Sequence, residues 1–247
     1  MRGLLRSQLN PLTSWFMPFR HVTARRLEAY YRRTLSDVGL AERWAAHYLG
    51  GLDIPAGAAV LDHGSGRGRH IAILQRLGYR VSGQDMAGHA WWDRLRPASL
   101  QVVPPAAPRL PWRDGSFHLV LDVEVLHYLD EASLARHVAE VHRVLAAGGY
   151  WVLVEANDQA YGAFLPRRFM GRLHSEEVIR RLTAHRFSTI DAGYEGVYAP
   201  YVPRLVNFIR QQAWPGPYDP ADYGSWLERR IPARRRAMWR MRLRKIT

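Results

Sequence analysis

Cysteine is absent from the 247 residues of the chain, and Lys245 is its single lysine. Without cysteine there is no disulfide, thiolate zinc site, iron–sulfur cluster or cysteine nucleophile. Long apolar runs are absent too: none reaches the ~18 residues that span a bilayer. Arg6, Gln8 and Pro11 interrupt the N-terminal region where a signal peptide would need an apolar core. We therefore expect a cytoplasmic protein that is not integral to a membrane.

The net charge of +13 comes almost entirely from arginine. One interpretation is an arginine-rich genome without functional consequence, and the other is attraction to acidic substrates, anionic lipid or nucleic acid. Many of the cations lie near the C-terminus, at Arg229, Arg230, Arg234, Arg235, Arg236, Arg240, Arg242, Arg244 and Lys245. Such a cluster is either a solvated face or a peripheral contact with an anionic inner membrane, worth ~1 kcal/mol per residue.

Short apolar runs alternate with amphipathic segments through the middle of the chain. The predicted strands are 58–64, 79–86, 117–125 and 150–156, and the predicted helices are 22–36, 37–52, 69–78, 131–149 and 175–187, the last capped by Ser175. This alternation favours a parallel sheet with helices on both faces. Ligands bind at the carboxyl ends of such strands. That rule places on one rim Asp62, the glycines after it, Asp85, Asp122 and Glu155.

Residues 238–246 alternate large apolar side chains with arginine. Period two predicts a closing edge strand with its arginines outward, and a basic helix is the alternative.

The sequence "DHGSGRG" places glycine at 64, 66 and 68. Glycine allows a sharp turn and a close approach to a ligand, although a simple strand-to-helix turn also explains it. A dinucleotide-binding loop would have its third glycine one residue later, where Arg69 stands. Asp62 before the turn suits a cationic amino group, and Asp85 can accept both hydroxyls of a ribose. Together they indicate a site for an adenosine that carries an amino acid, such as S-adenosylmethionine.

Three blocks of the sequence carry a family resemblance: "VLDHGSGRGRHIAILQRLGYRVSGQDM", "LPWRDGSFHLVLDVEVLHYLDE" and "EVHRVLAAGGYWVLVE". They resemble the signature blocks of class I S-adenosylmethionine-dependent methyltransferases, most closely the small-molecule group that includes the ubiquinone and menaquinone C-methyltransferases. The resemblance covers about residues 56–190. It implies a Rossmann-like α/β fold with a seven-stranded, mostly parallel sheet in a domain spanning 51–247. Residues 1–50 would form a helical cap, and the extension 198–247 would form part of a lid.

The resemblance also implies roles for individual residues. The methionine end of the cofactor would meet Asp62 and the loop residues Gly64, Ser65, Gly66 and Gly68. Asp85 would bind the ribose and Met86 the adenine, and Asp122 and Val123 would line the sulfonium. The family usually has an aspartate for the adenine amino group where this chain has Ala106. S-adenosylhomocysteine would be the product.

Methyl transfer needs the acceptor, methyl group and sulfur held in line, and it needs a base only if the acceptor must lose a proton. The candidate catalytic residues are Glu155, His127 and Tyr161, with Glu124 and His174 as weaker candidates. His63 is expected to be a buried core histidine. The sequence has no H-E-x-x-H and no H-x-H motif, so no metal site is predicted.

The acceptor is best predicted as a small molecule. Methylation of pyrimidine C5 commonly uses a cysteine, and enzymes that methylate nucleobase amines resemble one another in a D/N-P-P-Y/F motif where this chain reads "DVEV". Aromatic residues flank the core on both sides, at Trp15, Phe16, Phe19, Tyr30, Tyr31, Trp44, Tyr161, Phe164, Phe169, Tyr194, Tyr198 and Tyr201. They favour an apolar pocket for an aromatic or lipid-like acceptor, methylated on oxygen or carbon. The alternatives are a binding protein of this fold without turnover and an RNA methyltransferase.

Overall fold

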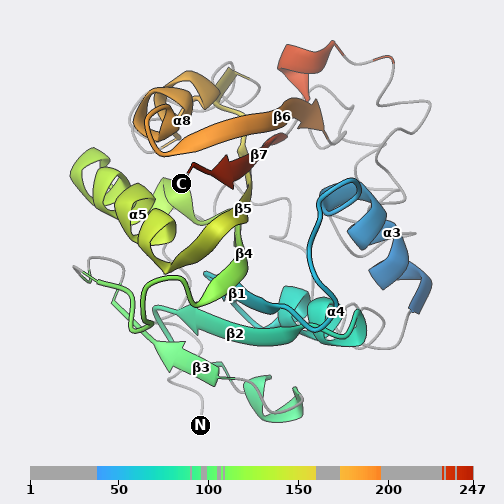
Figure 1. Ribbon diagram of the computed structural model, residues 1–247. Coiled ribbons are helices and arrows are strands. Elements are labelled where there is room, and N and C mark those ends of the chain that lie inside the picture. The colour runs from blue at the N-terminus through green and yellow to red at the C-terminus, as the bar shows by residue number, and fades with distance from the viewer. Residues whose placement is uncertain are drawn as a thin grey trace, which may run out of the picture.

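The computed structural model describes residues 38–89, 91–95, 99–104, 107, 109–159, 173–195, 230, 232–236 and 238–246, and the structural statements below concern these residues. Seven strands form one sheet in the order β3-β2-β1-β4-β5-β7-β6 (Figure 1). The strands are β1 (Ala59–His63), β2 (Arg80–Asp85), β3 (Ser99–Val102), β4 (Phe117–Val123), β5 (Leu145–Ala156), β6 (Phe187–Glu195) and β7 (Met238–Lys245). The helices are α3 (Val38–Tyr48), α4 (Arg69–Arg76), α5 (Glu131–Val144) and α8 (Glu176–Thr183), with 3-10 turns η2 (Trp92–Arg94), η3 (Leu126–Tyr128) and η5 (Ala233–Arg235).

The first five strands of the sheet are parallel to one another, and β7 is antiparallel to both β5 and β6. The predicted Rossmann-like, seven-stranded, mostly parallel sheet is confirmed. Because the sheet is covered on both sides, β1, β4 and β5 each contain a run of consecutive buried apolar residues, at 60–61, 119–121 and 150–154. Strand order reverses between β1 and β4, and this is where such sheets bind ligands at their carboxyl ends.

Two apolar clusters pack on opposite faces of the sheet. Figure 1 shows α5 and α8 on one side and α3 and α4 on the other. Leu61 and Trp151 face α5, whereas their neighbours Val60 and Val152 face α4. Successive side chains of a strand point to opposite faces, so each central strand supplies both clusters.

The predicted helix starts and stops are largely confirmed by the caps. The Ser175 side chain accepts a hydrogen bond from the Val178 backbone N–H at 3.3 Å, which begins α8 as expected. Gly78 follows the end of α4 with a left-handed φ of 86°. The predicted helix 131–149 is too long, because α5 ends at Val144 and Leu145 already pairs with Phe117 of β4.

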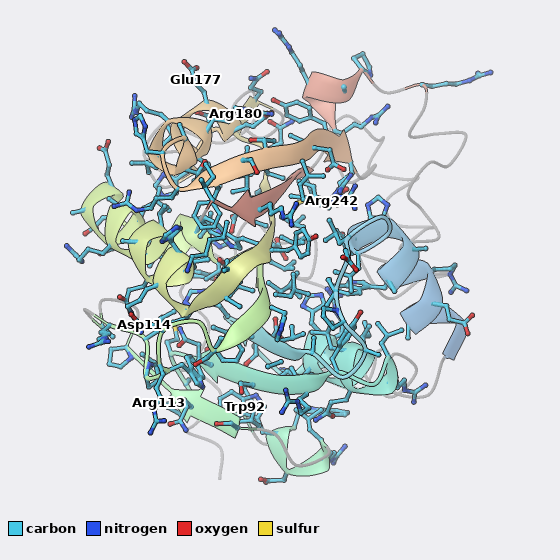
Figure 2. All side chains as sticks on the ribbon, in the orientation of Figure 1. Trp92, Arg113, Asp114, Glu177, Arg180 and Arg242 are labelled. Atoms are coloured by element: carbon cyan, nitrogen blue, oxygen red, sulfur yellow. The ribbon has the colours of Figure 1, made fainter. Side chains whose placement is uncertain are left out.

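The predicted edge position of β7 is wrong, since this strand lies between β5 and β6. Trp239, Met241 and Leu243 are buried on one face. On the other face Arg240 and Arg242 meet acidic groups of β6. Arg240 lies 3.1 Å from Asp191 and 3.2 Å from Glu195, and Arg242 also binds Asp191. In Figure 2 Arg242 lies between β7 and α3, and its Nη1 donates to the Gly50 carbonyl at 2.5 Å. Neutralised arginines allow a basic strand to take an interior place.

Part of the predicted N-terminal cap belongs to the core. Trp44 of α3 is 2% exposed and packs with Ile71 and Leu74 of α4. The predicted helix 22–36 and most of the flanking aromatic residues lie outside the described residues. None of the helices among the described residues has the length and apolar character to cross a membrane.

Candidate active site

The turn between β1 and α4 is formed by the predicted glycines. Gly64 and Gly66 have φ values of 71° and 51°, a left-handed conformation that is costly for other residues. A Cβ atom on Gly64 would lie 2.3 Å from Cγ2 of Val125, so only glycine fits there. A Cβ on Gly66 would meet nothing within 4 Å, so the loop has open space at its centre.

Asp85, at the end of β2, holds this loop in place. Its Oδ2 accepts a hydrogen bond from the Gly66 N–H at 2.8 Å, and its Oδ1 accepts one from the Ala87 N–H at 3.3 Å. Burial raises the pKa of Asp85, but the hydrogen bonds from His89, Gly66 and Ala87 outweigh burial and hold it below the ordinary value. The carboxylate is therefore ionised at neutral pH and lies directly beside the glycine turn.

Asp62, at the end of β1, is a buried carboxyl group in need of a partner. It is 1% exposed, and its Oδ2 has no hydrogen-bond partner among the described residues. Burial raises its pKa well above the ordinary value, and the nearby Arg69 guanidinium offsets only part of that effect. Because an unpaired buried carboxylate is costly, this geometry fits a ligand that brings an ammonium group to Oδ2.

Two predicted catalytic residues, Glu155 and His127, are brought together where β4 and β5 end. Glu155 Oε1 accepts hydrogen bonds from the backbone N–H groups of Val125 and Leu126, both at 2.6 Å. Its Oε2 lies 3.0 Å from Nδ1 of His127. Burial lowers the pKa of His127, but the Glu155 carboxylate outweighs burial and raises it above the ordinary value. The third candidate, Tyr161, lies outside the described residues.

The backbone is strained beside this pair. Glu124 has a φ of 58°, the one left-handed non-glycine residue in the described part of the chain, and its N–H donates to the Val154 carbonyl at 2.8 Å. Such conformations concentrate at functional sites. His174, a weaker candidate, lies 2.9 Å from the Leu129 carbonyl and so supports the segment that follows η3.

Comparison with known proteins decides the family. A model of the methyltransferase domain matches residues 61–153. An uncharacterised methyltransferase of Synechocystis is 31% identical over 162 residues, which cover 64% of this chain and 76% of that protein. The chain is an S-adenosylmethionine-dependent methyltransferase. Its cofactor is S-adenosylmethionine, in accord with the glycine turn and the two carboxyl groups that flank it.

Solved methyltransferases share the fold of this enzyme. The 1,6-didemethyltoxoflavin N1-methyltransferase of Burkholderia thailandensis, with its substrate and S-adenosylhomocysteine bound, is 20% identical with a TM-score of 0.53, covering 91% of this chain and 87% of that one. The geranyl diphosphate C-methyltransferase of Streptomyces coelicolor, bound to Mg²⁺, geranyl diphosphate and S-adenosylhomocysteine, is 16% identical with a TM-score of 0.53, covering 88% and 85%. At these identities the likeness establishes the fold of the methyltransferase and leaves its acceptor open.

The Asp122 side chain is directed away from the place that the sequence suggested for it. Asp122 is fully buried on the α5 face of the sheet, where Oδ2 accepts hydrogen bonds from Trp151 Nε1 at 2.7 Å and bonds to His137 Nε2 at 2.9 Å. Its Oδ1 bonds to Nδ1 of His63. Only the main chain of Asp122 is left for the predicted contact with the sulfonium. Val123, the next residue, packs on the opposite face.

The cluster of His63, Asp122 and His137 was not anticipated as a unit, although His63 is buried as predicted. Three atoms of metal-ligating type lie within 4.8 Å of one another in it. The two imidazole rings stack at 4.2 Å with 27° between their planes, and each bonds to the carboxylate. Burial raises the pKa of Asp122, but the two histidines outweigh it and hold that pKa far below the ordinary value. One signal for this cluster was available from the sequence: His63, Asp122 and His137 occupy strand and helix positions where the pattern predicts core-facing apolar residues.

Exposed apolar side chains lie at the ends of β2 and β3. Met86 is 53% exposed and Val102 is 58% exposed. A Cβ atom on Gly88 would lie 3.7 Å from Val102 Cγ2, which places this glycine beside the end of β3. An apolar surface therefore adjoins Asp85 on the side where the sequence predicted adenine, while Ala106 lies outside the described residues.

Proposed function

We propose that the methyltransferase transfers a methyl group to the oxygen or carbon of a small organic acceptor, aromatic or lipid-like in character. The observation that carries this proposal is the His127–Glu155 pair at the carboxyl end of the sheet. A base is useful only when the acceptor must lose a proton. Hydroxyl groups and carbon acids meet that condition.

The proposed cofactor contacts follow the geometry of the rim. Asp62 Oδ2, which lacks a partner among the described residues, binds the amino group. The main chain of the loop 64–68 lies along the methionine portion, Asp85 binds the ribose hydroxyls, and exposed Met86 contacts adenine. S-adenosylmethionine supplies a methyl group already activated on a positively charged sulfur.

Within the pair, His127 is the proposed base and Glu155 is a positioning residue. Both Glu155 oxygens accept hydrogen bonds, from two backbone N–H groups and from the imidazole, so this carboxylate is held in place by three partners. When Nδ1 carries the proton shared with Glu155, Nε2 of the neutral imidazole holds a lone pair. With S-adenosylmethionine bound, the acceptor proton would pass to Nε2 while the acceptor electron pair forms the bond to the methyl carbon, and the electron pair of the broken carbon–sulfur bond would remain on sulfur.

The charges of β7 support a small-molecule acceptor over nucleic acid or an anionic membrane. Arg240 and Arg242 are bound by carboxylates of β6, and the Lys245 ammonium donates to the Leu145 carbonyl at 2.7 Å. Arginines that are paired with carboxylates contribute little to a surface potential, whereas the carbonyl at Lys245 leaves the charge of that residue in place.

The test begins with calorimetric titration of S-adenosylhomocysteine. It continues with transfer of a labelled methyl group from S-adenosylmethionine into phenols, quinols and small-molecule extracts. His127→Gln should retain the affinity for S-adenosylhomocysteine and lose ~10²-fold or more in transfer rate. His185→Gln, at an exposed site in the turn that follows α8, is the matched control.

Two outcomes would contradict the proposal. Label found in RNA alone would favour the RNA methyltransferase. Cofactor binding without transfer to any extract would favour the binding protein.

A further inference from the structure

Gly66, at the centre of the cofactor loop, has both of its main-chain groups bound by one segment of the chain. Its N–H donates to Asp85 Oδ2 at 2.8 Å, and its carbonyl accepts from the indole Nε1 of Trp92, also at 2.8 Å. Trp92 belongs to η2, next to β2 and β3 in Figure 2. Asp85 and Trp92 thus hold the glycine turn from outside.

We propose that Trp92 is a positioning residue for the cofactor, acting through the Gly66 carbonyl. Gly66 has no side chain, and a Cβ placed on it would touch nothing within 4 Å, so packing does not define its conformation. Its left-handed φ of 51° is one of several conformations open to glycine. The indole hydrogen bond fixes the plane of the peptide between Gly66 and Arg67 and thereby selects one of these glycine conformations.

The same segment carries the other proposed cofactor contacts. Asp85 binds the Gly66 N–H and is the proposed ribose ligand, and Met86 follows it directly. Leu95 closes the segment, and a Cβ on Gly68 would lie 2.5 Å from its Cδ1. Release of Trp92 therefore loosens the loop relative to the ribose site without opening a core, because Trp92 itself is only half-buried.

The test separates the indole N–H from the ring. Trp92→Phe keeps an aromatic ring and removes the donor, and loss of one such bond should weaken S-adenosylhomocysteine binding about 3–10-fold in calorimetric titration. The midpoint of thermal unfolding should change little. Trp92→His, which restores a ring N–H, should recover part of the affinity. Trp91→Phe is the control, since Trp91 contacts Arg94, with 4.4 Å between the ring centroid and the guanidinium carbon.

Unchanged affinity in Trp92→Phe would overturn the proposal, and so would an equal loss in Trp91→Phe. Should Trp92→Phe fail to fold, hydrogen exchange of the indole N–H in the wild-type protein replaces it. The Trp92 indole N–H should exchange more slowly with S-adenosylhomocysteine bound than without it, and equal rates in the two states would refute the role. These measurements need no acceptor, so a failure of the proposed acceptor class leaves them unaffected.

Discussion

Replacing Glu155 by glutamine removes one negative charge from the carboxylate that joins the ends of β4 and β5. The substitution keeps the shape of the side chain and one carbonyl oxygen. That oxygen can still accept from the N–H groups of Val125 and Leu126, which bind Glu155 at 2.6 Å. The other oxygen is replaced by an NH₂ group that faces His127 Nδ1. To accept a hydrogen bond from this NH₂ group, the imidazole must carry its proton on Nε2 instead of Nδ1.

The size of the effect follows from these three bonds. A hydrogen bond to a charged group contributes about 1.5–3 kcal/mol and a neutral one about 0.5–1.5 kcal/mol. Loss of charge therefore costs ~1 kcal/mol for each backbone bond and about the same for the imidazole, while relief from burying a carboxylate offsets a part. We expect the free energy of unfolding to fall by about 2 kcal/mol, which lowers the unfolding midpoint by roughly 4–8 °C for a protein of this size.

Urea unfolding at several pH values measures this loss. Because Glu155 raises the pKa of His127, the pair stabilises the fold most below the unfolded-state histidine pKa, and that part is lost as pH rises through the folded-state value. The deficit of Glu155→Gln should therefore shrink between pH 6 and pH 8.5. Glu131→Gln, at an exposed site on α5, should change stability by less than ~0.5 kcal/mol. A loss below ~0.5 kcal/mol in Glu155→Gln, or one independent of pH, would refute the reasoning.

Three further predictions concern neighbouring groups. Asp62→Asn should weaken S-adenosylhomocysteine binding by tenfold or more in calorimetry, and normal affinity would contradict this prediction. The unfolding stability of this variant should stay equal or rise, because a neutral amide is less costly to bury than an unpaired carboxylate. Gly64→Ala should cost ~2 kcal/mol more in urea unfolding than Gly78→Ala, since both positions are left-handed but only Gly64 has Val125 in the way; equal losses would count against the clash. Burial lowers the pKa of His137, so the fold should lose stability as pH falls below the unfolded-state value near ~6.5. His137→Gln should flatten that slope in thermal unfolding, and an unchanged slope would exclude His137 as the cause.

The sequence was enough to predict most of the described elements and the rim. Apolar runs and helical periodicity depend on neighbouring residues, so they indicated the strands, the helices and the Ser175 cap before any tertiary contact was known. Parallel topology then places Asp62, Asp85 and Glu155 at one end of the sheet, since carboxyl ends of parallel strands share an edge.

Tertiary structure decided what each side chain meets. Strand alternation turns Asp122 to the α5 face, where His137 from a helix and Trp151 from β5 reach it. The insertion of β7 between β5 and β6 depended on the match between its arginines and the acids of β6, a pairing of segments about 50 residues apart. The Glu155–His127 bond and the Trp92–Gly66 bond likewise join residues 28 and 26 positions apart. The local sequence pattern determines whether a segment is a helix or a strand and which of its faces is apolar. Contacts between segments depend on how the strands are aligned with one another, and this alignment is defined only in the packed sheet.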